Sequence, residues 1–202
     1  RSTLFPYTTL FRSYIDEVHG VGLYGPNGAG ICERDKVDVD IINGTLAKAY
    51  GVQGGYICGK REFIDAIRSM ASAFIFTTSL SPVLCAGALT SIKYVKDHPE
   101  LREKLQERAQ KTKEELTRQG IEVLQNDSHI VPVIIGDAKK CKAVSDELLY
   151  KDGIYVQPIN YPTVAVGTER LRFTPTPFHT DTMIFDMVVK VKSAMRRCGR
   201  TK

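Results

Sequence analysis

Short apolar runs alternate with helical patterns over the first half of the chain. Four runs rich in β-branched and aromatic residues, each bounded by Gly, Asp or Ser, predict strands at residues 14–18, 40–46, 55–58 and 74–77. Their apolar character predicts that these strands are buried. Residues 62–70 have apolar side chains at helical spacing between two of the runs. The pattern predicts part of an α/β sheet.

A long helical region follows. Residues 81–97 are rich in Ala and Leu, and Pro82 suits the first turn of a helix. Pro99 interrupts the pattern, because proline cannot continue an unkinked helix interior. Residues 100–119 then carry Glu, Lys and Arg at helical spacings and end at Gly120, which is a C-cap signal.

The remainder has an α+β pattern without internal repeats. Strands are predicted at residues 121–125, 129–135, 154–159 and 170–174, and helices at residues 138–151 and 181–197. We therefore expect a partial large α/β domain at residues 14–98, a connecting helix at residues 99–120 and a small C-terminal α+β domain at residues 121–202.

Residues 1–13 are unlike the rest of the chain. They repeat Thr-Leu-Phe and Arg-Ser without a helical or strand period. Pro6 and the threonines interrupt the apolar core that a secretory signal requires. We interpret the stretch as a non-native artefact of translated adapter sequence, and we expect the native sequence to begin near Tyr14 and to be truncated upstream of it.

Composition excludes several classes of protein. Hydrophobic residues make up 43% of the chain and charged residues 25%, which is typical of a folded domain rather than a disordered one. No apolar run approaches the roughly 20 residues that span a bilayer, so no membrane association is expected. The net charge of +5 forms no basic stripe with interleaved aromatics, which argues against nucleic-acid binding and leaves a solvated surface or an anionic small-molecule partner.

Cysteine and histidine are scattered along the chain. The odd number of dispersed cysteines predicts a reducing compartment rather than a disulfide framework or a zinc site. No metal site is expected. These residues are Cys32, Cys58, Cys85, Cys141, Cys198, His19, His98, His129 and His179.

The first candidate cluster is Asp16-Glu17-Val18-His19, at the C-terminal end of a predicted strand. Ligands of open α/β sheets bind at that end. A carboxylate there can keep a ring nitrogen protonated, as the electron-sink chemistry of pyridoxal phosphate (PLP) requires. A surface acid, a helix cap or a core histidine is the alternative. The glycine-rich stretch at residues 22–30 has turn dipeptides and no dinucleotide or Walker register, so we interpret it as a turn-rich loop.

The second candidate cluster is Gly44-Thr45-Leu46-Ala47-Lys48-Ala49-Tyr50-Gly51. Small residues allow a planar cofactor to approach the backbone. A partly desolvated lysine at a strand end has a lowered pKa and can form a Schiff base or act as a general base. Thr45 could donate its hydroxyl to a phosphate oxygen. By itself, Lys48 could equally be a surface charge.

Together the two clusters resemble those of the α-oxoamine synthases, fold-type I PLP enzymes that condense an amino acid with an acyl-CoA. The similarity extends from Tyr14 to about Val191, and it is strongest to the members that use glycine and succinyl-CoA. The stretches that narrow it are residues 74–80, 129–133, 136–142, 157–164 and 167–175. The resemblance implies a fold-type I large-domain sheet followed by the small domain.

The resemblance also implies roles for residues near the cofactor. Lys48 is expected to bind PLP as a Schiff base and to move the α-proton of the substrate. Asp16 is expected to pair with the pyridine nitrogen, and His19 to contact the phenolic oxygen. Thr45 is expected to bind the phosphate, together with Thr77 from the partner subunit of a homodimer, although Thr77 could also be an ordinary strand residue.

For the substrates, the resemblance assigns Arg172 to the carboxylate of glycine and Thr163 to the carboxylate of the succinyl group. From the residues alone, Arg170 could take the place of Arg172. The alternatives are glycine C-acetyltransferase, 8-amino-7-oxononanoate synthase, or a non-catalytic partner subunit on the same fold. We expect the enzyme in a bacterial cytoplasm or a mitochondrial matrix, and the 202-residue chain to be inactive alone.

Overall fold

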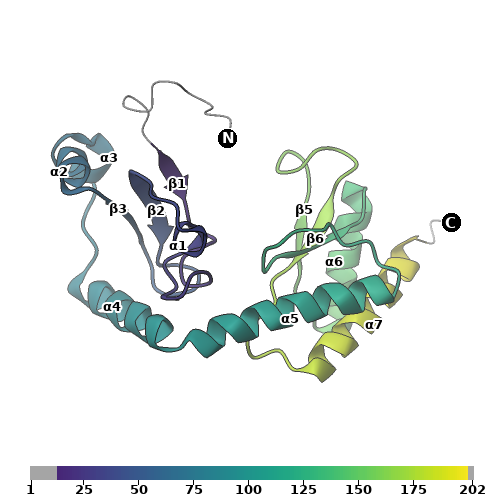
Figure 1. The fold of residues 1–202 in the computed structure, drawn as a ribbon. Helices are drawn as coiled ribbons and strands as arrows, with labels where there is room; N and C mark the ends of the chain where they lie inside the picture. The colour runs from purple at the N-terminus through teal and green to yellow at the C-terminus, as the bar shows by residue number, and fades with distance from the viewer. Residues whose placement is uncertain (1–12, 200–202) are drawn as a thin grey trace, which may run out of the picture. The chain divides into compact units, whose positions relative to one another are not determined.

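The computed structural model describes residues 13–199. Its contacts separate into two compact units that meet in sequence between Arg102 and Glu103 (Figure 1). Residues 1–12 of the stretch interpreted as an artefact lie outside the described residues. Ser13 is described, and its backbone N–H donates to Asp40 Oδ2 at 2.9 Å.

The first unit is built on a three-stranded sheet in the order β1-β2-β3. Strand β1 runs parallel to β2, and β3 runs antiparallel to β2. Because parallel strands end at the same edge of a sheet, the residues that follow β1 and β2 emerge together. The elements are β1 (Tyr14–Asp16), α1 (Ile31–Asp35), β2 (Ile41–Thr45), β3 (Gly55–Gly59), α2 (Arg61–Met70), α3 (Ser72–Ile75), α4 (Pro82–Asp97) and the beginning of α5 (Pro99–Arg118).

Strand burial differs from the prediction. All three residues of β1 are exposed, and no residue of β3 is buried. The small core of this unit consists of Val21, Leu46, Tyr50 and Ala88. An apolar strand becomes buried only when other elements cover its faces, and the described elements leave these strands uncovered.

The predicted strand at residues 74–77 is wrong. Residues Ser72–Ile75 form the short helix α3 instead. The N–H groups of Phe74 and Ile75 both donate to Ala71 O, at 2.9 and 3.0 Å. Local helical hydrogen bonds prevail here over β-propensity, which depends strongly on context. The five-residue helix α1 was not predicted, because it is too short to show a period.

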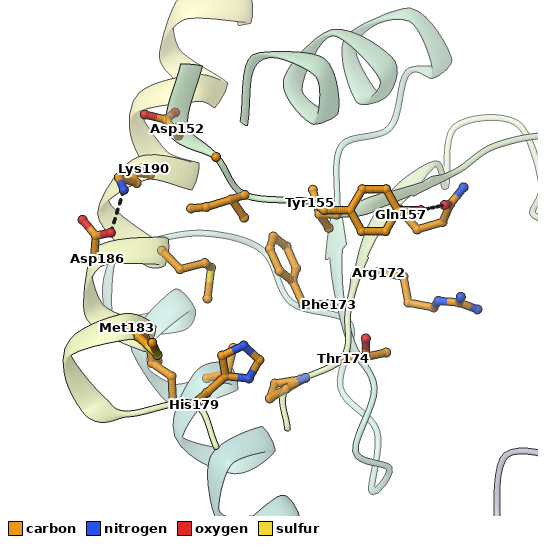
Figure 2. Close-up of a pocket in the computed structure, with 17 residues that line it drawn as sticks. Asp152, Tyr155, Gln157, Arg172, Phe173, Thr174, His179, Met183, Asp186 and Lys190 are labelled. Atoms are coloured by element: carbon orange, nitrogen blue, oxygen red, sulfur yellow. Dashed lines mark hydrogen bonds and ion pairs between the residues drawn. The ribbon is translucent and has the colours of Figure 1, made fainter. Parts of the chain in front are cut away.

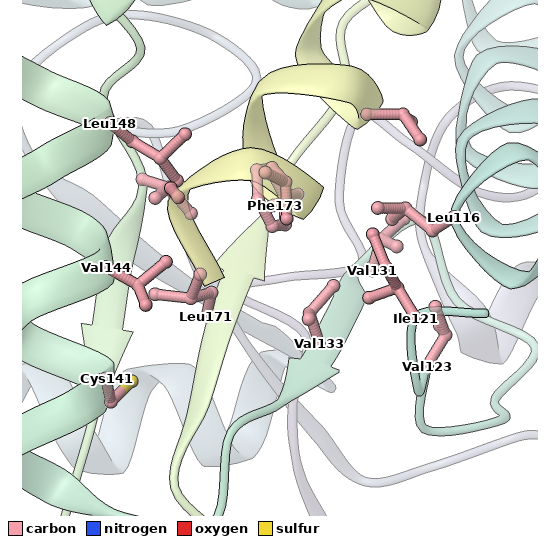
Figure 3. Packing of buried hydrophobic residues seen from close by; sticks show 14 residues of the cluster. Leu116, Ile121, Val123, Val131, Val133, Cys141, Val144, Leu148, Leu171 and Phe173 are labelled. Atoms are coloured by element: carbon pink, nitrogen blue, oxygen red, sulfur yellow. The ribbon is translucent and has the colours of Figure 1, made fainter. Parts of the chain in front are cut away.

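The second unit pairs a sheet with helices on one face. The sheet has the order β4-β6-β5 and is antiparallel throughout. Side chains of β4 and β6 pack with those of α5, α6 and α7 into the main apolar core (Figure 3). Besides the rest of α5, the elements are β4 (Val131–Ile134), α6 (Ala138–Asp152), β5 (Gln157–Ile159), β6 (Arg170–Phe173) and α7 (Asp181–Gly199).

The helix boundaries follow the sequence signals. Helix α4 ends at Asp97, as predicted, and α5 begins at Pro99, one residue before the predicted start. Gly120 has a φ of 73°, and the N–H of Ile121 donates to Leu116 O at 3.1 Å, which closes the C-terminus of α5. The strand predicted at residues 121–125 is reduced to one isolated bridge between Val123 and Val133. Backbone hydrogen bonds flank the bridge: Leu124 N–H donates to Pro132 O at 2.9 Å, and Ile134 N–H donates to Glu122 O at 3.0 Å.

Candidate active site

The edge of the first sheet brings three candidate residues to one place. Asp16 is the last residue of β1 and Thr45 the last residue of β2, and Lys48 lies in the turn that follows β2. Asp16 faces Asn43 across the parallel pair. The chain therefore delivers a carboxylate, a hydroxyl and an amine to the end of the sheet where ligands bind in α/β proteins.

The Asp16 carboxylate is oriented but exposed. Its Oδ1 accepts the N–H of Val18 at 2.9 Å, and its Oδ2 accepts from Asn43 Nδ2 at 3.4 Å. His19 follows in a turn that is closed by the N–H of Gly20, which donates to Glu17 O at 2.7 Å. The His19 side chain is exposed, so the alternative of a core histidine does not describe it.

Lys48 lies in a turn that is supported by contacts of Tyr50. Tyr50 is buried, its hydroxyl donates to Gly28 O at 3.4 Å, and its carbonyl accepts from Ser91 Oγ at 2.7 Å. Lys48 itself is exposed. The expected desolvation is therefore wrong for this chain taken alone, because Lys48 projects from a surface turn that the described residues do not cover.

The Thr45 hydroxyl already has two partners. It donates to Gly54 O at 3.3 Å and accepts the N–H of Ala47 at 3.2 Å. The bond to Gly54 is long for a hydroxyl donor. Binding a phosphate through this proton requires the hydroxyl to rotate away from Gly54, which costs little at that distance.

Thr77 belongs to none of the strands of this sheet. It is exposed in the segment after α3, and its hydroxyl donates to Ala73 O at 2.5 Å. Nothing in the described chain brings it to the other candidates, so its expected role depends on a second subunit.

In the second unit, Arg172 lies on β6 opposite Pro132 and Gln157. It contributes to the lining of a cavity of about 530 Å³ (Figure 2). Figure 2 shows Arg172 and Phe173 pointing to opposite sides of the strand, as alternation requires. Phe173 enters the core, and Arg172 lies on the face that the helices leave open.

The two arginines of β6 differ in their hydrogen bonding. Arg170 Nε donates to Thr168 O at 2.8 Å. Arg172 Nε is buried and has no hydrogen-bond partner among the described residues. A buried donor without a partner is costly, and a carboxylate would satisfy it. Thr163 is exposed in the turn after β5, where its N–H donates to Asn160 O at 3.0 Å.

Two features of the site were not assigned a role from the sequence. Glu17 is 2% exposed, and its carboxylate accepts two backbone N–H groups. Tyr56 lies behind the Lys48 turn, where burial and then Tyr50 raise its pKa to about 12. The sequence did carry one signal for the burial of Glu17: successive side chains of a strand point to opposite faces, so Glu17 points away from the side of Asp16.

Two kinds of feature are absent from the described residues, a metal-binding cluster and a membrane-spanning helix. No group of His, Cys, Asp and Glu suited to holding a metal ion occurs among residues 13–199. Within the same range, no helix has both the length and the apolar character needed to cross a bilayer.

The chain belongs to the aminotransferase class I and II family, because the sequence model of that family matches residues 11–190. Enzymes of this family use PLP. Curated relatives narrow the similarity to one kind of enzyme within the family. The chain is 52% identical to 5-aminolevulinate synthase of Bradyrhizobium diazoefficiens over 93% of this chain and 46% of that protein. It is 54% identical to 5-aminolevulinate synthase 1 of Cereibacter sphaeroides, over 92% of this chain and 46% of that protein.

A mitochondrial relative is similar over a shorter range. The 5-aminolevulinate synthase of Schizosaccharomyces pombe is 52% identical over 83% of this chain and 30% of that protein. The chain thus spans about half the length, or less, of the curated relatives that it matches.

Solved structures show the same fold. Serine palmitoyltransferase of Sphingomonas wittichii aligns with a TM-score of 0.86 at 28% identity, covering 95% of this chain and 49% of that one. A variant of serine palmitoyltransferase from S. paucimobilis, with a PLP–myriocin aldimine bound, aligns with a TM-score of 0.86 at 29% identity over 94% of this chain and 48% of that one. These neighbours are fold-type I PLP enzymes, so the predicted fold class is confirmed.

Proposed function

We propose that the full-length protein containing this chain condenses glycine with succinyl-CoA to give 5-aminolevulinate, coenzyme A and carbon dioxide, at the start of tetrapyrrole biosynthesis. One observation carries the proposal: Asp16 and Lys48 emerge at the same edge of the sheet. The choice of substrates rests on the identity of 52–54% to 5-aminolevulinate synthases.

The residues at the sheet edge suit PLP by their chemistry. An exposed amine can form a covalent bond to the aldehyde of the cofactor, an exposed carboxylate can pair with its ring nitrogen, and a hydroxyl can donate to its phosphate. Lys48, Asp16 and Thr45 supply these groups, and His19 supplies a further donor for the phenolic oxygen. PLP, when bound, provides the electron sink for a carbanion at the substrate α-carbon.

The side chains of this protein then have distinct tasks. The Lys48 amine removes a proton from the α-carbon of glycine as a general base, and as a general acid it returns a proton to that carbon after carbon dioxide has left. The Arg172 guanidinium binds the glycine carboxylate, which satisfies its buried Nε. Thr163 donates to the carboxylate of the succinyl group. A bound carboxylate fixes the α-carbon relative to the base, which is where much of the rate enhancement originates.

We further propose a homodimer in which the partner subunit supplies Thr77 to the phosphate. The exposed position of Thr77, which leaves it accessible to a second subunit, supports this assignment. The compartment depends on the organism: we expect the cytoplasm in a bacterium and the mitochondrial matrix in a eukaryote. The relatives include a bacterial protein and one named as mitochondrial.

Two kinds of rival remain. Glycine C-acetyltransferase or 8-amino-7-oxononanoate synthase would share the PLP residues and differ in the acyl donor. Comparing kcat/KM for succinyl-CoA and acetyl-CoA in the full-length enzyme separates them, and a preference for acetyl-CoA would exclude our proposal. A non-catalytic partner subunit would be expected to lack the lysine, which this chain retains at Lys48.

The Lys48→Ala variant of the full-length enzyme tests the proposal directly. Loss of the amine removes both the covalent attachment and the proton carrier, so we expect turnover to fall by roughly 10²-fold or more. Borohydride reduction should attach PLP to the parent enzyme and not to the variant. Lys60→Ala is the matched control, since Lys60 is also exposed and lies outside the Lys48 turn. Retention of borohydride-stable PLP by Lys48→Ala would contradict the assignment.

A further inference from the structure

Glu17 is a buried carboxylate that the proposed chemistry does not use. It follows Asp16 directly and precedes His19 by two residues, so it lies between two candidate cofactor contacts. Its side chain is 2% exposed, whereas those of Asp16 and His19 are exposed. Successive residues of an extended segment point to opposite sides, so Glu17 faces the interior while Asp16 faces the site.

Every polar group of Glu17 has a partner. Its Oε2 accepts the N–H of Ile31 at 2.9 Å, and its Oε1 accepts the N–H of Cys32 at 2.6 Å. Its own N–H donates to Asn43 O at 2.8 Å, which extends the β1–β2 pairing beyond Asp16. Its carbonyl accepts the N–H of Gly20 and of Val21, at 2.7 and 2.9 Å. Glu17 thus ties the exit of β1 to β2 and to α1.

The neighbouring glycines leave room for this carboxylate. A Cβ on Gly30 would lie 2.7 Å from Glu17 Cδ, and Gly30 has a φ of 119° that disfavours other residues. A Cβ on Gly20 would lie 1.9 Å from Glu17 Oε2. Both ends of the loop from residue 20 to residue 30 therefore pack against one carboxylate.

We propose that Glu17 is a positioning residue, which holds the exit of β1 so that Asp16 and His19 meet the cofactor. This inference rests on the proposed function. A catalytic side chain must be held within about 0.5 Å by its supporting contacts. An opposite charge close to a titrating group favours its charged form by roughly 1–3 pKa units, and a displaced Asp16 loses part of that effect on the ring nitrogen.

Glu33, which lies on α1, offers a matched control because it bonds to the same loop. Its carboxylate accepts from Asn27 N at 3.1 Å, from Asn27 Nδ2 at 2.6 Å and from Ala29 N at 3.0 Å. Burial alone would raise the pKa of Glu33, but the hydrogen bonds from Asn27 and Ala29 lower it. Glu33 therefore also supports the loop, without touching the segment that carries Asp16.

The experiment compares Glu17→Gln and Glu33→Gln in the full-length holoenzyme. Glutamine keeps one acceptor oxygen, but its amide N–H₂ faces a backbone donor and cannot replace the second bond. The protonation of the ring is followed by ¹⁵N NMR of PLP labelled at its ring nitrogen. We expect Glu17→Gln to lower the pKa of that nitrogen by about one unit or more. Glu33→Gln should leave it unchanged, although both substitutions lower the thermal midpoint.

Glu17→Asp is a second variant that keeps the test possible if Glu17→Gln does not fold. It keeps the charge on a shorter side chain that cannot reach both N–H groups, so we expect a smaller shift in the same direction. If the ¹⁵N titrations of the Glu17 variants match the parent, or if Glu33→Gln shifts equally, the positioning role is wrong. Absence of bound PLP or of a protonated ring nitrogen in the parent would instead contradict the proposed function.

Discussion

At the scale of single residues, the Lys48 turn depends on a glycine that leaves space for a ring. Gly44 faces Tyr56 across the antiparallel pair of β2 and β3. A Cβ on Gly44 would lie 2.4 Å from Tyr56 Cζ, too close for any side chain without movement of the ring. Tyr56 packs against the cluster that contains Tyr50, so displacing its ring would disturb the support of the Lys48 turn.

Gly44→Ala should therefore destabilise the full-length protein by about 1–3 kcal/mol, the usual cost of overpacking. Gly87→Ala is the control, because Gly87 lies inside α4 and its Cβ would meet nothing closer than 3.8 Å. In a helix interior, alanine is favoured over glycine by up to about 1 kcal/mol, so Gly87→Ala should be neutral or stabilising. Thermal unfolding of both variants measures the difference, and a Gly44→Ala midpoint equal to that of the parent would refute the argument.

At the scale of elements, α6 depends on its N-cap. Asp137 Oδ1 accepts the N–H of Lys140 at 2.8 Å, and the helix that follows buries Cys141, Val144 and Leu148 in the second core. Asp137→Ala removes the cap and should cost about 1 kcal/mol, whereas Asp137→Asn retains an acceptor and should cost much less. The thermal midpoints of the two variants test this order. Equal losses would mean that the side-chain cap contributes nothing measurable.

At the scale of the whole molecule, the first unit leaves much apolar surface exposed. Val83 is 81% exposed and Phe76 is 87% exposed, and Ala88 is the single buried residue of α4. Large exposed apolar patches mark surfaces that bind another protein segment. Strand β1 also forms one edge of the sheet, which invites pairing with other chains.

We therefore expect the 202-residue chain alone to be inactive and prone to association. Its turnover with glycine and succinyl-CoA should be undetectable under conditions in which the full-length enzyme is active. Sedimentation should show it in species larger than a monomer or dimer. Detectable synthase turnover from the chain alone would contradict this expectation.

Much of the local structure was predictable. Pro82, Pro99 and Gly120 set the ends of α4 and α5, because their backbone constraints act on their immediate neighbours. Residues 74–77 could not be assigned correctly, since their β-propensity competes with a local turn from Ala71 and the outcome depends on whether a partner strand is present.

In the candidate site, too, the residue types were predictable and their arrangement in space was not. The motifs around Asp16 and Lys48 were sufficient to propose both residues, but their shared edge depends on the parallel pairing of β1 with β2. The resemblance favoured Arg172 over Arg170, and the structure adds a physical difference, since Arg172 Nε alone of the two lacks a partner.

The sequence by itself determined the longer helices, the turns that end them and the residue types available for chemistry. These depend on interactions within a few residues, so they can be read from local patterns. Tertiary structure alone decided that the Glu17 carboxylate meets the N–H groups of Ile31 and Cys32, and that the residues of β1 remain exposed. Burial is set by segments distant in sequence, and a local pattern does not specify which of them will meet.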